Sequence, residues 1–264
     1  MRSRRIRCFA HSFLLLPLLV LGAYADTLNM GTAGSYAVLG ASTVTNTGPT
    51  VLYGNLGVGP GCAITGFPPG IVHGTTNTCN AATVKAQSDL TTAFNVAMGQ
   101  PRTGTLTGQD LGGKTLTHGV YFFATSAGLT GQLTLNNNGN RNAVFVFQIG
   151  STLTTASSSS VIFTNGPDKN VFWVVGSSAT LGTTTKFVGH ILALDSITLN
   201  NGASITCGSA LARTGAVTMN NNVITGCKAA GTVPEPGTIS LMGSGLAILA
   251  GAARLRRRIY LRIA

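Results

Sequence analysis

Short alternations of apolar and small polar residues recur along the middle of the chain. They occupy residues 104–107, 129–131, 152–155, 179–182, 196–199 and 216–219. Such alternation is typical of strands with one buried side. The intervals from Leu181 to Leu199 and on to Met219 are 18 and 20 residues, about one coil of three short strands. We therefore expect a β-solenoid in which apolar side chains point inward and Thr, Ser and Asn point outward. A β-sandwich is the alternative, but its strands would be longer, with more regular turn clusters.

One segment, at about residues 80–98, departs from this pattern. Its apolar residues recur at helical spacing, and Gly99 and Pro101 follow it as residues that end a helix. The apolar positions are Ala86, Leu90, Ala93, Phe94 and Ala97. We expect a single helix beside the strands.

The N-terminus has the organisation of a secretory signal peptide. Four arginines within residues 2–7 precede an apolar stretch at 13–21, and Ala23-Tyr24-Ala25 forms a cleavage site. This predicts that signal peptidase removes residues 1–25 and that Asp26 begins the mature chain.

The C-terminus carries a second targeting pattern. Val233, Pro234, Glu235 and Pro236 precede an apolar run at 239–252 and an arginine-rich tail at 254–258. A helix of this run would span ~21 Å at ~1.5 Å per residue, short of the ~30 Å core of a bilayer, so we expect weak transmembrane anchoring. The order of the three parts resembles the PEP-CTERM sorting signal of Gram-negative bacteria; a plain membrane anchor is the alternative.

That resemblance implies where the protein travels. It implies processing of segment 233–264 by an exosortase, transient anchoring in the inner membrane, and export to the cell surface or extracellular space, often alongside exopolysaccharide. Arginines behind an apolar segment remain cytoplasmic, so the body would lie outside. Residues 26–232 are then expected to form a single domain.

The positive charge reflects targeting rather than ligand binding. The chain has 17 basic and 6 acidic residues, a net charge of +11. Between Asp26 and Pro234, however, eight basic residues stand against five aspartates, a net charge of +3. The eight basic residues form no cluster, which argues against nucleic-acid binding.

Four cysteines remain in the mature chain. An even number in an exported protein favours two disulfides, with three possible connectivities. We favour Cys62–Cys79 and Cys207–Cys227 because both loops are short; free buried cysteines are the alternative. The spacing of cysteine and histidine does not fit a zinc site, and we expect no metal or other cofactor.

Several longer stretches together resemble the ice-binding-like family of bacteria and fungi. They are residues 36–48, 54–58, 106–112, 143–150 and 170–176, within a match from about residue 27 to residue 225. The resemblance implies a discontinuous right-handed β-solenoid of triangular section with one long helix alongside. This agrees with the helix and the coil period.

The resemblance also implies a candidate ice-binding face of stacked T-[AG]-x-[TN] rungs. The matching positions begin at Thr155, Thr183, Asn201 and Asn220, and the candidate side chains are Thr155, Ser158, Thr183, Thr185, Asn201, Ser204, Asn220 and Asn222. A flat array of small hydroxyl and methyl groups can order water in a lattice. Ser158, Ser204 and Lys186 depart from the pattern, so we expect weak activity, seen as inhibition of ice recrystallisation. Ordinary outward-facing polar residues of a solenoid are the alternative.

Catalytic patterns are weak. Residues 108–115 fit the P-loop pattern, but the sequence that follows is strand-like instead of helical. The mature chain before Pro234 has no glutamate and no closely spaced aspartates. A polysaccharide-cleaving β-helix, the third alternative, would therefore require aspartates that the fold brings together. His73, His118 and His190 are scattered. We expect no catalytic residues and no enzyme activity.

Two functions remain open from the sequence. The first is binding to ice crystal surfaces by an exported protein. The alternative is a structural or adhesive role at the cell surface or in an exopolysaccharide matrix, without ice activity. Both are compatible with one fold, because function depends on the surface that the fold presents.

Overall fold

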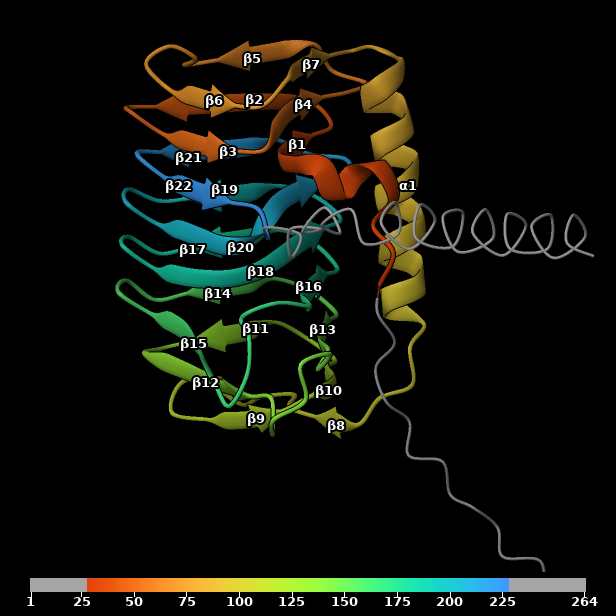
Figure 1. The fold of residues 1–264 in the computed structure, drawn as a ribbon, viewed down its shortest axis with the longest axis vertical. Coiled ribbons are helices and arrows are strands. Elements are labelled where there is room, and N and C mark those ends of the chain that lie inside the picture. The colour runs from red at the N-terminus through yellow and green to blue at the C-terminus, as the bar shows by residue number, and fades with distance from the viewer. Residues whose placement is uncertain (1–27, 228–264) are drawn as a thin grey trace, which may run out of the picture.

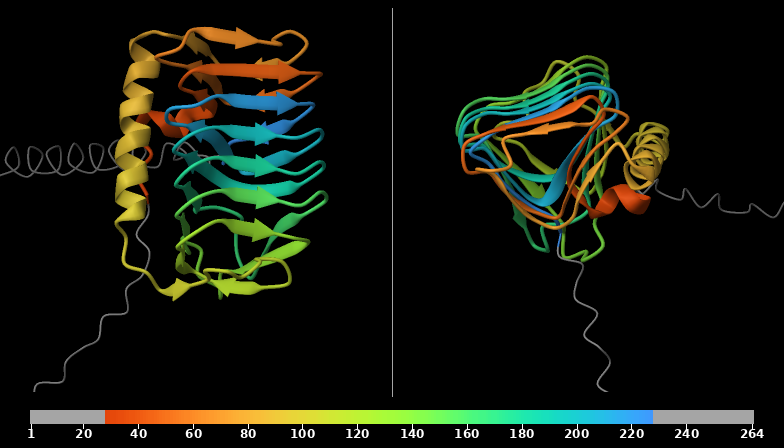
Figure 2. Two further views of the ribbon diagram at one scale, coloured as in Figure 1. Left: turned by 180° about the vertical axis from the view of Figure 1, so that it is seen from behind. Right: turned by 90° about the horizontal axis from the view of Figure 1, so that it is seen from above.

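The computed structural model describes residues 28–227, so both predicted targeting segments, 1–25 and 233–264, lie outside the described residues. Parallel strands stack into coils around a prism that is triangular when viewed from above, with one long helix alongside (Figures 1 and 2). The predicted β-solenoid with its single helix is confirmed. We name the three sides the helix face, the seven-stranded face and the third face.

The helix face is the side against which the helix packs. Its strands are, in spatial order, β8 (Gly104–Thr105), β10 (Gly119–Phe123), β13 (Phe145–Ile149), β16 (Val171–Val175), the second part of β18 (Lys186–Ala193), the second part of β20 (Ser204–Ala212), β1 (Tyr36–Gly40), β4 (Asn55–Val58) and β7 (Thr76–Thr78).

The seven-stranded face forms a separate sheet. Its strands are β11 (Ala127–Leu129), β14 (Leu153–Thr155), β17 (Ala179–Leu181), β19 (Ile197–Leu199), β21 (Val217–Asn220), β2 (Thr43–Thr47) and β5 (Ala63–Thr65). They appear as evenly stacked rungs in the left view of Figure 2.

The third face completes the prism. Its strands are β9 (Thr115–Thr117), β12 (Gln132–Asn136), β15 (Ser160–Thr164), the first parts of β18 and β20, β22 (Val223–Thr225), β3 (Val51–Tyr53) and β6 (Ile71–His73). Because β18 and β20 continue around the corner, the third face and the helix face belong to one 15-stranded sheet.

Glycine makes that corner possible. Gly189, within β18, has φ +105°, which L side chains rarely adopt. A Cβ on Gly208, the neighbouring corner residue of β20, would lie 1.9 Å from the carbonyl oxygen of Gly189. The two strands can therefore turn and stack only with glycine here.

The order of the coils in space differs from their order in the chain. The first strands, β1 to β7, form one end of the prism; the helix then runs back along it, and β8 to β22 fill the prism from the other end (Figure 1). As a result β1 pairs with β20, β2 with β21, and β3 with β22. Two distant parts of the sequence thus meet in the middle of the stack.

The helix α1 (Ala81–Met98) lies almost where the sequence predicts it. The Asn80 side chain accepts a hydrogen bond from the amide of Thr83, and Gly99 is the C-cap. Its apolar stripe packs on outward-facing residues of the helix face, including Val146, Val174 and Leu211. This cover explains why the strands beneath it are apolar on both sides.

A second core fills the prism. Phe147 and Trp173 stack with ring centroids 3.9 Å apart, and Phe187 lies 4.8 Å from Trp173. All three side chains are fully buried. Each coil therefore contributes inward side chains that pack mainly on those of the neighbouring coils.

Both favoured cysteine pairs are joined in the structure. Cys62 is bonded to Cys79 and Cys207 to Cys227, with sequence separations of 17 and 20 residues. Each bond links neighbouring coils, in agreement with the connectivity expected from the short loops.

Candidate functional site

One outward column of the seven-stranded face consists of threonines in register. Thr154 pairs with Thr180, Thr180 with Thr198, and Thr198 with Thr218. The column continues across the junction between distant chain segments, where Thr218 pairs with Thr45 and Thr45 with Thr65. We call this column the threonine ladder: Thr154, Thr180, Thr198, Thr218, Thr45 and Thr65. Gly128, the partner of Thr154, ends it.

The strands hold this ladder rigidly. In β19, the residues on either side of Thr198, Ile197 and Leu199, are 0% and 1% exposed, so the threonine between them must point outward. Adjacent parallel strands lie ~4.8 Å apart, which sets the repeat of the ladder. A β-branched side chain also has few χ1 choices. The ladder therefore presents methyl and hydroxyl groups at regular positions.

The ladder hydroxyls are available for water. Within residues 28–227, none of them hydrogen-bonds another protein group. The neighbouring outward column is different: Thr152 Oγ1 donates to Ser126 Oγ at 2.8 Å, and Ser178 Oγ accepts from the amide of Ser196 at 3.2 Å. Hydroxyls beside the ladder thus brace the sheet, whereas those of the ladder remain free.

The columns that flank the ladder carry no charge. On one side are Ser126, Thr152, Ser178, Ser196, Ala216, Thr43 and Ala63. On the other side, at the corner with the third face, is an exposed column of Ser157, Thr183, Asn201, Asn220 and Thr47. The residues of these three columns are therefore small, polar or apolar, and uncharged; a charged residue, Asp110, follows in the ladder's column only beyond Gly128, with which it pairs.

Three side chains of the candidate face expected from the sequence are buried. Thr155, Thr185 and Asn222 are 3%, 0% and 0% exposed. Thr155 Oγ1 and Thr185 Oγ1 are 2.9 Å apart, and the Asn222 amide donates to the carbonyls of Asn200 and Ala203. They stabilise the corner from inside, so their expected place on an exposed face is wrong.

The remaining candidates are divided between two surfaces. Thr183, Asn201 and Asn220 share the exposed corner column beside the ladder. Ser158 is also exposed at this corner, where its hydroxyl lies 3.0 Å from that of Thr184. Ser204 lies around the corner on the third face, paired with Lys186. The structure brings together one part of the expected set, at the border of the ladder.

The ladder itself was missed, although the sequence carried a signal for it. Thr154, Thr180, Thr198 and Thr218 are outward positions of the alternating segments that predict the strands. The T-[AG]-x-[TN] match begins one residue after the ladder position at Thr155 and two or three residues after it in the other three rungs, so it continues into the turn. Strict alternation from the buried Leu, Ile and Val positions would have identified the ladder.

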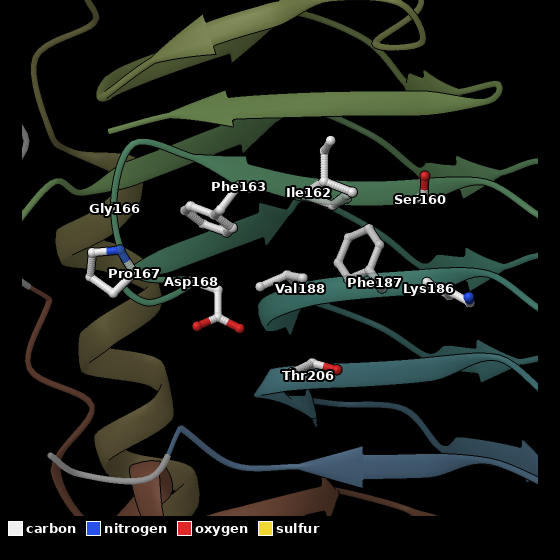
Figure 3. A pocket seen from close by; sticks show the side chains of 11 residues that line it. Ser160, Ile162, Phe163, Gly166, Pro167, Asp168, Lys186, Phe187, Val188 and Thr206 are labelled. Atoms are coloured by element: carbon white, nitrogen blue, oxygen red, sulfur yellow. The ribbon is translucent and has the colours of Figure 1, made fainter. Parts of the chain in front are cut away.

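The third face is irregular by comparison. Val188, Phe163 and the Pro167-Asp168 turn surround a hollow of ≈ 460 Å³ (Figure 3). Lys186 projects beside it, and Ile162 is 37% exposed. A surface that combines a hollow, a flexible cation and large apolar side chains does not present a repeating array.

Other candidate chemistry finds no supporting geometry. The P-loop-like sequence leads into strand β9, and Lys114 Nζ donates to Gln109 Oε1 at 2.8 Å. His190 Nδ1 lies 2.8 Å from Ser209 Oγ, and burial lowers the pKa of the imidazole to about 4. Residues 28–227 contain no group of three His, Cys, Asp or Glu side chains placed to hold a metal. None of their helices is long and apolar enough to cross a membrane.

Comparison with known proteins identifies the fold and its relatives. The model of the family described as "Ice-binding-like" matches residues 38–225. The chain belongs to the ice-binding-like family. A second model, the PEP-CTERM protein-sorting motif, matches residues 232–258 and implies exosortase-mediated sorting and export. Both resemblances expected from the sequence are thereby confirmed.

The relatives of this ice-binding-like chain are similar over most of its length. An ice-binding protein of Nostoc sp. is 54% identical, covering 89% of this chain and 90% of its own. The crystal structure of an ice-binding protein from the Antarctic ascomycete Antarctomyces psychrotrophicus is 40% identical, with a TM-score of 0.73 over 76% of this chain and 98% of its own. Another, from an Antarctic biological consortium, is 42% identical, with a TM-score of 0.74 over 76% and 92%.

Proposed function

We propose that the chain binds ice through the seven-stranded face, with the threonine ladder at the centre of the contact. The observation that carries this proposal is the six-threonine column in register. The names of the relatives support it, since proteins at 54% and 40% identity are ice-binding proteins.

The physical basis is preorganisation. A ladder built on stacked strands loses little conformational freedom on binding. Little of the favourable free energy of its contacts is therefore cancelled by lost conformational entropy. The free hydroxyls can hydrogen-bond lattice water, while the methyl groups occupy apolar positions between them. The absence of charge from the ladder and its flanking columns avoids the desolvation that charged side chains would require.

We expect the activity to be modest and to appear as inhibition of recrystallisation. Lys186, one reason for expecting weakness from the sequence, lies on the third face and does not interrupt the ladder. Only one column is all threonine, however. The flanking columns mix Ser, Thr, Ala and Asn, so regularity extends fully in one direction only.

The proposal is tested with residues 26–232 in ice-recrystallisation and thermal-hysteresis assays. The deciding variant is Thr198→Tyr, because Thr198 lies in the middle of the ladder and its ring would break the flat surface. Central contacts of an interface carry most of the binding energy, ~2 kcal/mol or roughly thirtyfold in the concentration needed. Thr206→Tyr, on an exposed position of the third face, is the matched control and should keep wild-type activity.

The result that contradicts the proposal is equally clear. If wild-type protein leaves ice growth unchanged at high micromolar concentration, ice binding is excluded and a structural role in a surface matrix becomes the better account. If Thr206→Tyr is as damaging as Thr198→Tyr while both remain folded, a different face binds.

We also propose that the apolar run 239–252 holds the precursor in the inner membrane until the sorting motif is processed. Its length and the arginines behind it support this topology. The location of full-length protein in membrane fractions, compared with a chain ending at residue 232, tests it; equal amounts in the soluble fraction would contradict it. Under the proposed ice-binding function, the chain has no catalytic activity.

A further inference from the structure

We propose that the fold is built to present the threonine ladder outward while the C-terminal segment holds the chain on a surface. The chain would then act as a surface-displayed ice binder and would not require release for function. This inference rests on the proposed ice-binding function, and it adds the orientation of the site relative to its attachment.

The described chain ends at the corner opposite the seven-stranded face. Cys227 is bonded to Cys207, which follows third-face residue Thr206 in β20 and precedes Ser209 on the helix face. The preceding residue, Gly226, donates its amide to the carbonyl of Tyr53 at 3.2 Å. In the view from above, the blue end of the described chain lies at this corner of the triangle (Figure 2, right).

Other obstructions to a flat surface are gathered near the same corner. Leu28, the first described residue, and Cys227, the last, line one groove there. The insertions at residues 137–144 and 165–170, between third-face and helix-face strands, also lie on this side. The helix covers the helix face. The seven-stranded face is thus the one side that avoids the helix, both insertions and both ends of the described chain.

The link to the anchoring segment leaves from this corner. Four residues, 228–231, separate Cys227 from the start of the matched motif at residue 232, and eleven residues, 228–238, separate it from the apolar run at 239–252. Fully extended, eleven residues reach ~40 Å at ~3.6 Å per residue. The link therefore decides which corner of the prism is attached, and the ladder lies on the side away from that corner.

This geometry leaves the ladder accessible in the tethered protein. The attached corner is the part of the prism at which the link begins, and the ladder lies on the opposite side. Ice approaching from the medium can therefore reach the ladder without obstruction by the attachment. An attachment on the side of the ladder would instead bring that face against the support.

The test couples the full-length mature chain, kept in detergent, to beads in three ways. One attachment is a biotin after Ala264, the second is through Asp168→Cys in an insertion near the attached corner, and the third is through Ser157→Cys beside the ladder. Asp168 and Ser157 are both exposed turn residues, so the two cysteine variants are matched. The other four cysteines of the mature chain are bonded in pairs.

Each variant is first assayed free in solution and then as beads exposed to growing ice. The adsorption of each kind of bead is compared with the activity of the same variant in solution. Relative to that activity, we expect retention of ice adsorption for beads attached through Ala264 or residue 168, and its loss for beads attached through residue 157. Equal adsorption of all three kinds of bead would overturn the inference, and so would inactivity of beads attached through Ala264. If the free wild-type protein is inactive, the proposed function itself fails, which is a separate outcome.

Discussion

The seven-stranded face and the third face show how one inward pattern can support two unlike surfaces. Both are parallel, and both bury apolar side chains in the prism, aliphatic on the seven-stranded face and both aliphatic and aromatic on the third face. Outward, the first repeats threonine, whereas the third places Lys186, Val223 and Tyr53 at comparable positions. Inward packing therefore does not account for the regularity of the ladder, whereas the proposed contact with ice would.

The corner between these faces sets a border for the proposed contact. Thr183→Tyr places a ring in the corner column, beside the ladder, while Thr198→Tyr places it in the centre. We expect Thr183→Tyr to weaken recrystallisation inhibition by roughly fivefold, or ~1 kcal/mol, because peripheral contacts contribute less than central ones. A dilution series of both variants measures the difference. Equal loss of activity in both variants would indicate that the contact with ice includes the corner column as fully as the ladder.

His190, which lies just after the corner between the third face and the helix face, should make the stability of the protein depend on pH. Burial lowers its pKa from 6.5 to about 4, so the folded protein disfavours the protonated ring. The unfolded chain takes up this proton first as the pH falls. The contribution of neutral His190 to the free energy of unfolding is therefore fully present above pH 6.5. It is lost as the pH falls toward 4, by on the order of 2–3 kcal/mol.

The measurement is urea unfolding at pH 7 and pH 4.5. His190→Gln, which can still hydrogen-bond Ser209, should flatten the dependence in this window. Asp89, whose pKa is lowered to about 2 chiefly by its hydrogen bond with Lys85, affects stability only at lower pH. An unchanged pH profile in His190→Gln would show that other groups control it.

Thr185, a buried threonine, distinguishes hydroxyls that stabilise the fold from those proposed to contact ice. Thr185→Val preserves shape but removes the hydrogen bonds of the Thr185 hydroxyl to Thr155 and to the carbonyl of Ala156. We expect a loss of ~1–2 kcal/mol in the free energy of unfolding, since the buried hydrogen bond between the Thr155 and Thr185 hydroxyls is lost. Ice activity per folded molecule should remain at the wild-type level. A loss of activity without a loss of stability would return Thr185 to the binding surface.

The smallest effect is expected on the third face. Val223 is 44% exposed and lies outside the proposed contact. Val223→Thr should change the free energy of unfolding by less than ~0.5 kcal/mol, as is usual for surface positions. Recrystallisation inhibition should be unchanged. Gain or loss of activity in this variant would show that the third face also contacts ice.

The sequence by itself determined the local elements of this protein. Alternation around Ile197 and Leu199 predicts a strand with one buried side, and the spacing from Ala86 to Ala97 predicts the helix. The short separations within each cysteine pair favoured the disulfides that the structure contains. These features depend on neighbours in the chain or on a regular period, so a linear pattern is sufficient to reveal them.

The tertiary structure alone decided which residues share a surface. The pairing of Thr218 with Thr45 joins residues 173 positions apart, and no local period indicates it. The turn at Thr185 and Asn222 folds inward because its polar groups must satisfy carbonyls inside the corner, whereas a pattern of small polar residues suggests an exposed face. A binding surface on a solenoid is set by the register between coils, and register is a long-range property of the folded chain.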